Sequence, residues 1–402
     1  IVNLNFLLFT IFGIAILKLK ILKAKLDLPF KIIFLFFCFI IFSTFVSLII
    51  HLYNEESDYV DLNNLIKSII FFRFFVILII ICLLNKMNIL NFKYFVYVGT
   101  ILTILISLDI IFQYSFGFNI IGLPSTDYHN SSFFGDELIA GGFILRFSIF
   151  TLLFSIFLIN KNKSINFFTI TFLICLLGMG ILLSGNRMPL FLFVMIASLI
   201  IILEKKTRIF FPLFILTFSL SLFILYNSSS LVKNNLSSFY LKVGQLSNAL
   251  ISNKIDRSKL PDHFYEFETF YDTWLMNKYI GGGIKSFRFN CPKRQNIEKD
   301  ERSTCNTHPH NYYLEILTDL GIVGFILVST IFFLIFYNSF IKKYFLSSGL
   351  KKNHLITPFV FIFIAEIFPI KSSGSFFTTG NSTIIFLVMA IIVGLAEKKD
   401  KI

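Results

Sequence analysis

Residues 32–51 read IIFLFFCFIIFSTFVSLIIH and contain no Asp, Glu, Lys or Arg. A helix of about 20 apolar residues spans the hydrocarbon core of a bilayer, so this run predicts a membrane-spanning helix. Similar runs recur to the end of the chain. The expected spans are residues 4–17, 32–51, 65–84, 94–116, 138–159, 166–183, 189–203, 209–226, 312–338, 355–370 and 380–396. The sequence therefore predicts an all-α polytopic membrane protein with about 11–12 transmembrane helices.

Composition supports a membrane protein. Hydrophobic residues make up 56% of the 402 residues and charged residues only 15%, whereas about a quarter of a soluble domain is charged. The net charge is +13, but many of the lysines form short clusters between apolar runs. A nucleic-acid-binding protein would instead gather its positive charge on one soluble face, so we expect no nucleic-acid partner.

The linkers between the expected spans alternate in charge. Lysine clusters occupy residues 18–25, 86–93, 161–163, 205–208, 342–352 and 398–401, whereas residues 52–64 and 117–137 contain acidic residues and no Lys or Arg. The positive-inside rule assigns the first set to the cytoplasm and the second to the outside. The C-terminus is then cytoplasmic. Counting back places the N-terminus outside, and one further upstream helix would place it inside.

One long linker, residues 227–310, falls outside the cytoplasm and divides the chain into three parts. Residues 1–226 form the N-terminal transmembrane helices, 227–310 the large outer loop and 311–402 the C-terminal transmembrane helices. Within the loop, aromatic residues recur at helical spacing over 262–279. This pattern predicts an amphipathic helix that lies on the membrane surface or covers a cavity.

The cysteines agree with this topology. Cys38, Cys82 and Cys175 lie in expected spans and are interpreted as small buried apolar residues. Cys291 and Cys305 share the outer loop, where an oxidising compartment permits a disulfide. Such a bridge would close a small basic loop just before His308; the alternative is two free thiols.

The strongest local signal is THPHNYYLEILTDLGIVG, residues 307–324, which joins the outer loop to a span. His310 would lie at or just before the N-terminus of a long helix. That end of a helix attracts anions and keeps a nearby imidazole neutral. A neutral histidine beside an anion site suits base-assisted attack on a phosphate-activated substrate. The alternative is that His308 or His310 only caps or packs the helix.

The motif formed by His310-Asn311, nine further residues and Gly321 resembles the hallmark of the O-antigen ligase and O-antigen polymerase superfamily of bacterial envelope enzymes. Many spans with one large periplasmic loop before the last few are also similar to that family. The resemblance implies a GT-C-like multi-pass protein of the bacterial inner membrane whose active site faces the periplasm. It further implies an inverting glycosyltransferase that needs no metal and no cofactor.

The resemblance also implies the substrates. The donor would be an undecaprenyl-diphosphate-linked glycan, and the acceptor a sugar hydroxyl on lipid A-core or on a growing polysaccharide, with membrane lipids around the protein. His310 would take the proton of the acceptor. Asn311 and His308 would contact substrate beside it.

Three arginines are candidates for binding the diphosphate. Arg187 ends the turn Leu183-Ser184-Gly185-Asn186-Arg187, which resembles a Ser-x-Ser/Asn-Arg element of the family, and a guanidinium suits phosphate oxygens. The alternative is an arginine that extends to lipid headgroups. Arg146 falls inside an expected span and contacts either substrate or an acid such as Asp136, Glu137 or Glu366. Arg288 follows the glycine turn Gly281–Gly283, whose N–H groups can approach an anion.

Two functional alternatives stay open. Ligase and polymerase activities are not separated by any residue of the motif. A non-enzymatic polysaccharide transporter or flippase would use Arg146 to line a path. Such a protein should show paired halves with interrupted helices, and the pattern of spans does not indicate them. We expect His310 and the arginines to converge on one outer pocket.

Overall fold

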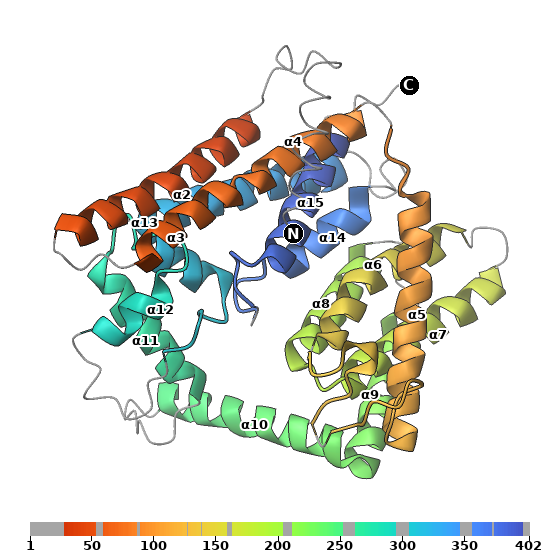
Figure 1. Ribbon diagram of the computed structural model, residues 1–402. Helices are drawn as coiled ribbons and strands as arrows, with labels where there is room; N and C mark the ends of the chain where they lie inside the picture. Colours follow the sequence, from red (N-terminus) through yellow and green to blue (C-terminus); the bar gives the residue numbers. More distant parts are fainter. Residues whose placement is uncertain are drawn as a thin grey trace. The chain divides into compact units, whose positions relative to one another are not determined.

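The computed structural model describes residues 28–53, 59–86, 89–126, 128–137, 139–158, 163–203, 211–251, 262–294, 305–345, 356–371 and 374–396. These residues are mostly helical and form no β-strand (Figure 1), which confirms the all-α prediction. The chain divides into two compact units. The first contains Ile1–Leu90 and Leu260–Ile402, and the second contains Asn91–Lys259.

The described helices confirm a polytopic membrane protein. Five of them are long and apolar enough to cross a bilayer: Leu28–Tyr53, Leu62–Asn85, Tyr94–Phe116, Tyr312–Lys342 and Thr379–Ala396. A sixth candidate is the pair Ile215–Ser228 and Ser230–Ser238, which is bent by 107°. Shorter apolar helices coincide with four further predicted spans. The predicted span 4–17 and most of the lysine clusters lie outside the described residues.

The first unit packs its helices around phenylalanine rings. Its main elements are α2 (Leu28–Tyr53), α3 (Tyr59–Phe71), α4 (Arg73–Lys86), α11 (Asp262–Met276), α12 (Phe287–Asn290), α13 (Tyr312–Phe336), α14 (Ile356–Glu366) and α15 (Thr379–Ala396). Helix α4 packs on α15, and α2 packs on α13. Phe37, Phe71 and Phe386 meet with ring centroids 5.1 to 6.1 Å apart, which is the usual range for aromatic pairs.

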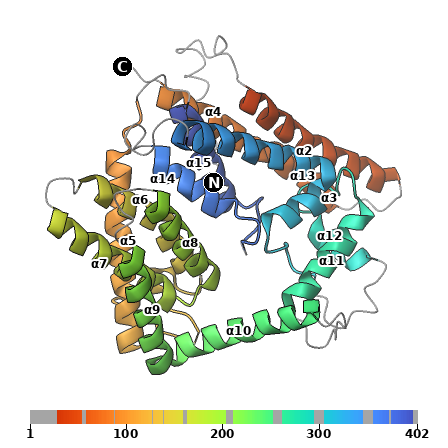
Figure 2. The same ribbon diagram turned by 180° about the vertical axis from the view of Figure 1, so that it is seen from behind.

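The second unit is built on α5 (Phe92–Phe116), α6 (Ala140–Leu158) and α7 (Lys163–Leu183), which pack on one another (Figures 1 and 2). Helices α8 (Arg187–Leu203), α9 (Phe211–Ser228) and α10 (Ser230–Ile251) complete it. Helix α10 was not predicted, because its first half is rich in Asn and Ser. Ser229 starts it: its hydroxyl accepts a hydrogen bond from the N–H of Val232 at 3.2 Å, as an N-cap serine does.

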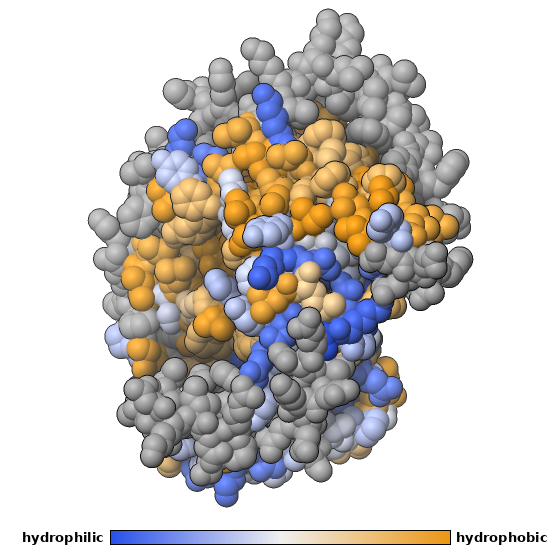
Figure 3. Space-filling view, turned by 90° about the vertical axis from the view of Figure 1, so that its left-hand side faces the viewer, coloured by the Kyte–Doolittle hydropathy of each residue, from blue (hydrophilic) through white to orange (hydrophobic). Residues whose placement is uncertain are grey.

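Large hydrophobic side chains stay exposed along the spans. On α2 these include Phe34, Leu35, Phe42, Phe45, Ile49 and Ile50. Figure 3 shows a broad hydrophobic area on one face of the protein. A bilayer is the solvent that such a surface requires, since exposed apolar patches of this kind are rare in water.

Helix α13 differs from the sequence prediction in one respect. The apolar pattern predicted an unbroken helix over 312–338, but the backbone at Gly321 is not helical, with φ 64° and ψ −169°. Helix α13 therefore consists of a first segment before Gly321 and a second segment after it. A nine-residue π-helix, Tyr337–Phe345, follows the second segment.

Candidate functional site

The first segment of α13 begins directly after the predicted catalytic histidine. Asn311 is the N-cap: its side-chain oxygen accepts hydrogen bonds from the N–H groups of Tyr313 at 2.9 Å and Leu314 at 3.2 Å. His310 precedes the cap and is exposed. Its ring centroid lies 4.8 Å from that of His308, edge to face. The two imidazoles therefore form one pair at the positive end of a helix.

The Asn311 side chain has a second structural role. Its amide N–H group donates to the carbonyl of Pro369 at 2.7 Å and to that of Lys371 at 3.3 Å. Lys371 in turn forms an ion pair with buried Glu366 at 2.7 Å. The amide thus fixes the helix start to the segment after α14. Contact of Asn311 with substrate stays a prediction.

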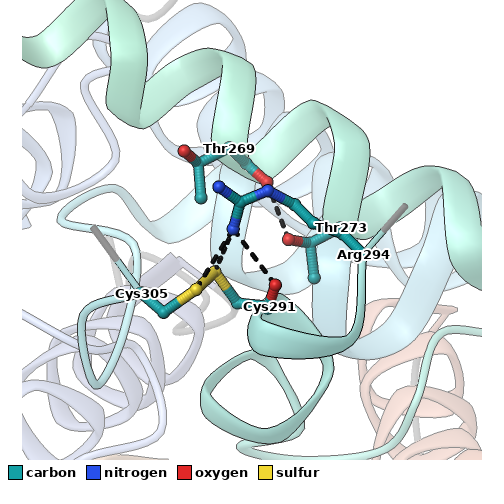
Figure 4. The surroundings of a disulfide bond; sticks show 5 residues. All are labelled: Thr269, Thr273, Cys291, Arg294 and Cys305. Carbon is teal, nitrogen blue, oxygen red and sulfur yellow. Dashed lines mark hydrogen bonds between the residues drawn. A yellow bond between two sulfur atoms is a disulfide. The ribbon is translucent and has the colours of Figure 1, made fainter. Parts of the chain in front are cut away.

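A disulfide lies just before the histidine pair. Cys291, at the end of α12, is bonded to Cys305, 14 residues along the chain, with their Cα atoms 5.6 Å apart. Buried Arg294 donates from Nη1 to the Cys291 carbonyl at 3.1 Å and to both sulfurs at 2.9 and 3.1 Å, as Figure 4 shows. The bridge ties the segment that leads to His308 onto the helix that contains Arg288.

The glycine turn of the outer loop is locked into the break of α13. Gly321 and Gly281 both have positive φ, 64° and 72°. A Cβ atom on Gly281 would lie 2.2 Å from the Asp319 carbonyl oxygen, and one on Gly321 would lie 2.3 Å from that of Tyr279. Only glycine fits at such backbone approaches. The break in α13 and the glycine turn 281–283 therefore pack against each other, and each requires the other.

Backbone hydrogen bonds join the glycine turn to α13. Ile322 donates to the carbonyl of Lys278 at 2.9 Å, and Gly283 donates to that of Asp319 at 2.8 Å. On the other side of the turn, Ser43 of α2 donates its hydroxyl to the Ile280 carbonyl at 2.6 Å. Ser43 lies ten residues before the end of α2, which is about 15 Å along the helix. Residues 278–283 thus lie between α2 and α13, and their irregular backbone is satisfied by protein groups.

Lys285 and Arg288 act electrostatically on His308, and Lys67 acts on Lys285. Burial lowers the pKa of the Lys285 ammonium; Arg288 and Lys67 lower it further, while Glu315 and Asp319 act in the opposite direction. The pKa of His308 is also lowered, first by burial and then by His310, Arg288 and Lys285. Like charges that disfavour one another in this way are stabilised by a bound anion. The arrangement combines a neutral imidazole with a cluster of cations, which we call the cation cluster: Lys67, Lys285 and Arg288.

Comparison with known proteins agrees with this chemistry. Residues 170–329 match the family model described as O-antigen ligase. The matched range is 160 of the 402 residues, and it supports the O-antigen ligase and polymerase superfamily. No curated protein matches the chain. The matched range includes Arg187, Arg288 and the His310–Gly321 motif, so the family resemblance and the geometry concern the same residues.

The second unit holds Arg187 by an amide. Asn235 of α10 accepts hydrogen bonds from Nε of Arg187 at 3.3 Å and from Nη2 at 3.0 Å. Asn235 is nearly buried and donates to the Tyr128 carbonyl at 3.2 Å. A neutral amide orients the guanidinium without cancelling its charge. Arg187 itself is exposed.

The turn before Arg187 is packed tightly by its small residues. Gly185 has φ 79°, and a Cβ atom there would lie 2.1 Å from the Tyr128 carbonyl oxygen. Asn186 accepts a hydrogen bond from the N–H of Gly141 at 2.9 Å, which fixes the turn to the start of α6. Arg146 lies half-buried five residues further along α6. Arg187 and His310 belong to different units, so their convergence on one pocket stays a prediction.

Two cations inside a predicted span were missed. Lys67 and Arg73 lie in the candidate span Leu62–Asn85, and Arg73 donates to the Thr379 hydroxyl at 2.8 Å. Any charge within an apolar run is a functional candidate, so this signal was present in the sequence. Among the described residues, no group of three or more His, Cys, Asp or Glu side chains could hold a metal ion.

The predicted amphipathic helix of the loop is present as α11. It packs on α13, and the two helices line a mainly apolar pocket of about 350 Å³. The lining includes Phe267, Phe270 and Tyr271 of α11, and Leu314, Leu317 and Thr318 of α13. Helix α11 therefore lines one side of this pocket, and its predicted role as a cover or a membrane-surface helix stays a prediction.

Proposed function

We propose that this membrane enzyme of the O-antigen ligase family transfers a glycan from a polyprenyl-diphosphate carrier to a sugar hydroxyl. The observation that supports this most is the histidine pair at the start of α13 beside the cation cluster. In the proposed reaction, the acceptor oxygen bonds to the anomeric carbon of the donor as the bond from that carbon to the diphosphate oxygen breaks. The hydroxyl proton passes to His310, and the electron pair leaves with the diphosphate.

The cation cluster stabilises the leaving group in this proposal. Arg288 offers a planar fork of donors for phosphate oxygens, and Lys285 offers a compact charge beside it. The two acids near them are committed elsewhere, because Asp319 accepts hydrogen bonds from the turn and Glu315 from Ser375 and Phe376. Positive charge therefore stays available for the charge that develops as the diphosphate departs.

His310 is the proton acceptor in this proposal, and His308 is a neighbouring substrate contact. His310 is exposed, as a group that meets an incoming hydroxyl must be. Arg187 in the second unit is the further diphosphate ligand, held by Asn235. Arg146 is the weaker candidate for the same role. If attack and departure occur in one displacement, the anomeric configuration is inverted. NMR can test this by comparing the anomeric configuration of the donor with that of the product.

We propose that the reaction needs no metal, because cationic side chains can take the place of a divalent ion. Transfer by the purified enzyme should then be unaffected by a chelator such as EDTA. We also propose that the active site faces the periplasm of the inner membrane, because the glycine turn, the disulfide and the histidines all belong to the predicted outer loop. A disulfide suits that oxidising compartment.

The test replaces His310 with Ala in the full-length protein. We expect glycan transfer to fall by about 10²- to 10⁴-fold, the usual contribution of a general base, with normal membrane insertion. His51→Ala, at the end of α2, is the matched control and should keep wild-type transfer. Retained transfer in His310→Ala would refute His310 as the proton acceptor. Retained transfer together with loss of carrier translocation would refute the enzyme and support a flippase.

A deletion strain separates ligase from polymerase. If the surface polymer is absent while polymerised chains accumulate on the lipid carrier, the enzyme is the ligase. If the core is capped by a single repeat unit, the enzyme is the polymerase. We propose the ligase role first, because the matching family model is described as O-antigen ligase.

A further inference from the structure

Asp319 is an acid of the first unit that accepts hydrogen bonds with both of its carboxyl oxygens. Its side chain is fully buried, with 0% exposed. One carboxyl oxygen accepts from the N–H of Lys285 at 2.7 Å. The other accepts from the Ser286 hydroxyl at 3.1 Å and from the N–H of Phe287 at 3.0 Å. All three donors belong to one turn of the outer loop.

That turn needs an external partner to keep its shape. Lys285 has φ 60°, a conformation that costs a non-glycine residue of order 1–3 kcal/mol unless its surroundings enforce it. The N–H groups of Lys285 and Phe287 precede or begin α12, where helix donors lack partners within the helix. Asp319 supplies acceptors to both. The same turn presents Lys285 and, on α12, Arg288.

We propose that Asp319 is a positioning residue that places the cation cluster beside the histidine pair by holding the Lys285–Phe287 turn. The proposal rests on the proposed function and adds a residue to it. Asp319 lies nine residues after His310, near the end of the helix segment that begins directly after the histidine. One short helix therefore fixes the proton acceptor at its start and the anion-binding turn at its end.

A direct role of Asp319 in proton transfer does not fit its contacts. Both carboxyl oxygens are occupied by the turn, and the side chain is fully buried, so it cannot meet a hydroxyl of the acceptor. Glu315, one turn earlier, provides the contrast. It accepts from Ser375 and Phe376 and so holds the segment before α15, which contains no cation among its described residues 374–378.

Asp319→Asn is the sharpest variant, because it keeps the volume of the side chain. Its oxygen can still accept from Ser286 and Phe287, while its amide N–H group faces the N–H of Lys285. The Lys285 end of the turn is released and the rest of the fold is retained. Asp272→Asn on α11 makes the same chemical change at a half-buried position of the same loop, outside the turn.

The readout is the affinity of the full-length purified protein for inorganic pyrophosphate, measured by calorimetry. We expect Asp319→Asn to weaken binding by about tenfold, as for one lost hydrogen bond to a charged group, and Asp272→Asn to leave it unchanged. The same substitution is then made in a Lys285→Met/Arg288→Met background. There it should weaken residual binding by less than about twofold, because the groups it positions are gone.

An equal weakening in both backgrounds, or wild-type affinity in Asp319→Asn, would overturn the proposal. Failure of the proposed function has another signature. If His310→Ala keeps transfer, the proton acceptor is wrong, yet pyrophosphate binding still reports on Asp319. If Asp319→Asn lowers transfer without changing pyrophosphate affinity, Asp319 acts on something other than the cations.

Discussion

Gly321→Ala tests whether the break in α13 holds the outer loop in place. A Cβ atom at Gly321 would lie 2.3 Å from the Tyr279 carbonyl oxygen, 2.4 Å from its carbon and 2.6 Å from the Ile280 nitrogen. All three are backbone atoms, so no flexible side chain can move aside. The turn must separate from α13, or α13 must change its course.

The magnitude follows from the contacts that this separation removes. A non-glycine residue at φ 64° and ψ −169° costs of order 1–3 kcal/mol. Three backbone hydrogen bonds, from Ile322, Val323 and Gly283, span the contact and contribute roughly 1 kcal/mol each. The docked turn should therefore lose about 4–6 kcal/mol relative to the separated one. That is roughly a 10³- to 10⁴-fold change in the equilibrium.

The chain contains a spectroscopic probe at this contact. Its single tryptophan, Trp274, donates from Nε1 to the Lys278 carbonyl at 3.0 Å, and the same carbonyl accepts from Ile322. We expect Gly321→Ala to raise quenching of Trp274 fluorescence by iodide and to abolish glycan transfer. Gly380→Ala, where a Cβ atom meets nothing within 4 Å, should change neither. Wild-type quenching together with wild-type transfer in Gly321→Ala would refute the reasoning.

Three other predictions concern the charges and the disulfide. Asn235→Asp places a carboxylate against Arg187 and neutralises it, so the KM for the lipid-linked donor should rise about tenfold in a transfer assay; an unchanged KM would contradict the role of Arg187. Cys305→Ser removes the constraint on a loop of about 15 residues, worth roughly 3 kcal/mol, and should lower the temperature at which activity is lost; dithiothreitol should affect the wild type only. Arg288→Met removes a positive charge that lowers the pKa of His308, so the pKa of His308 should rise and its ring should protonate at higher pH. NMR titration of histidine-labelled protein measures this, and an unchanged pKa would show that Arg288 is not a neighbour of His308.

Much of the fold could be predicted because each span is decided by its own residues. Residues 32–51 and 94–116 lack the charge density that would keep them in water, and α2 and α5 form there. The amphipathic helix at 262–279 followed from spacing of its aromatic residues in the same way. The motif His310-Asn311 located the start of α13 because a cap, a helix start and an apolar run follow one another in the chain.

The break at Gly321 could not be predicted, because its cause lies about 40 residues away. Leu320, Ile322 and Val323 fit an apolar helix, and only the contact with Tyr279 and Gly281 requires positive φ. The partners of Asp319 were hidden for the same reason. The cation cluster near His308 also needed the fold, since Lys67 is more than 200 residues from Lys285.

Three side chains at the start and along the first segment of α13 explain how irregular backbone can exist beside a membrane helix. Asn311 binds the segment 369–371, Glu315 binds the turn at 375–376 and Asp319 binds the turn at 285–287. Each of these segments has N–H or C=O groups that hydrocarbon cannot satisfy. The first segment of α13 supplies the missing partners on successive turns, so the loops on its several sides are fixed to one short helix. The position of His310 is then set by hydrogen bonds within the protein and does not depend on how the surrounding lipid packs.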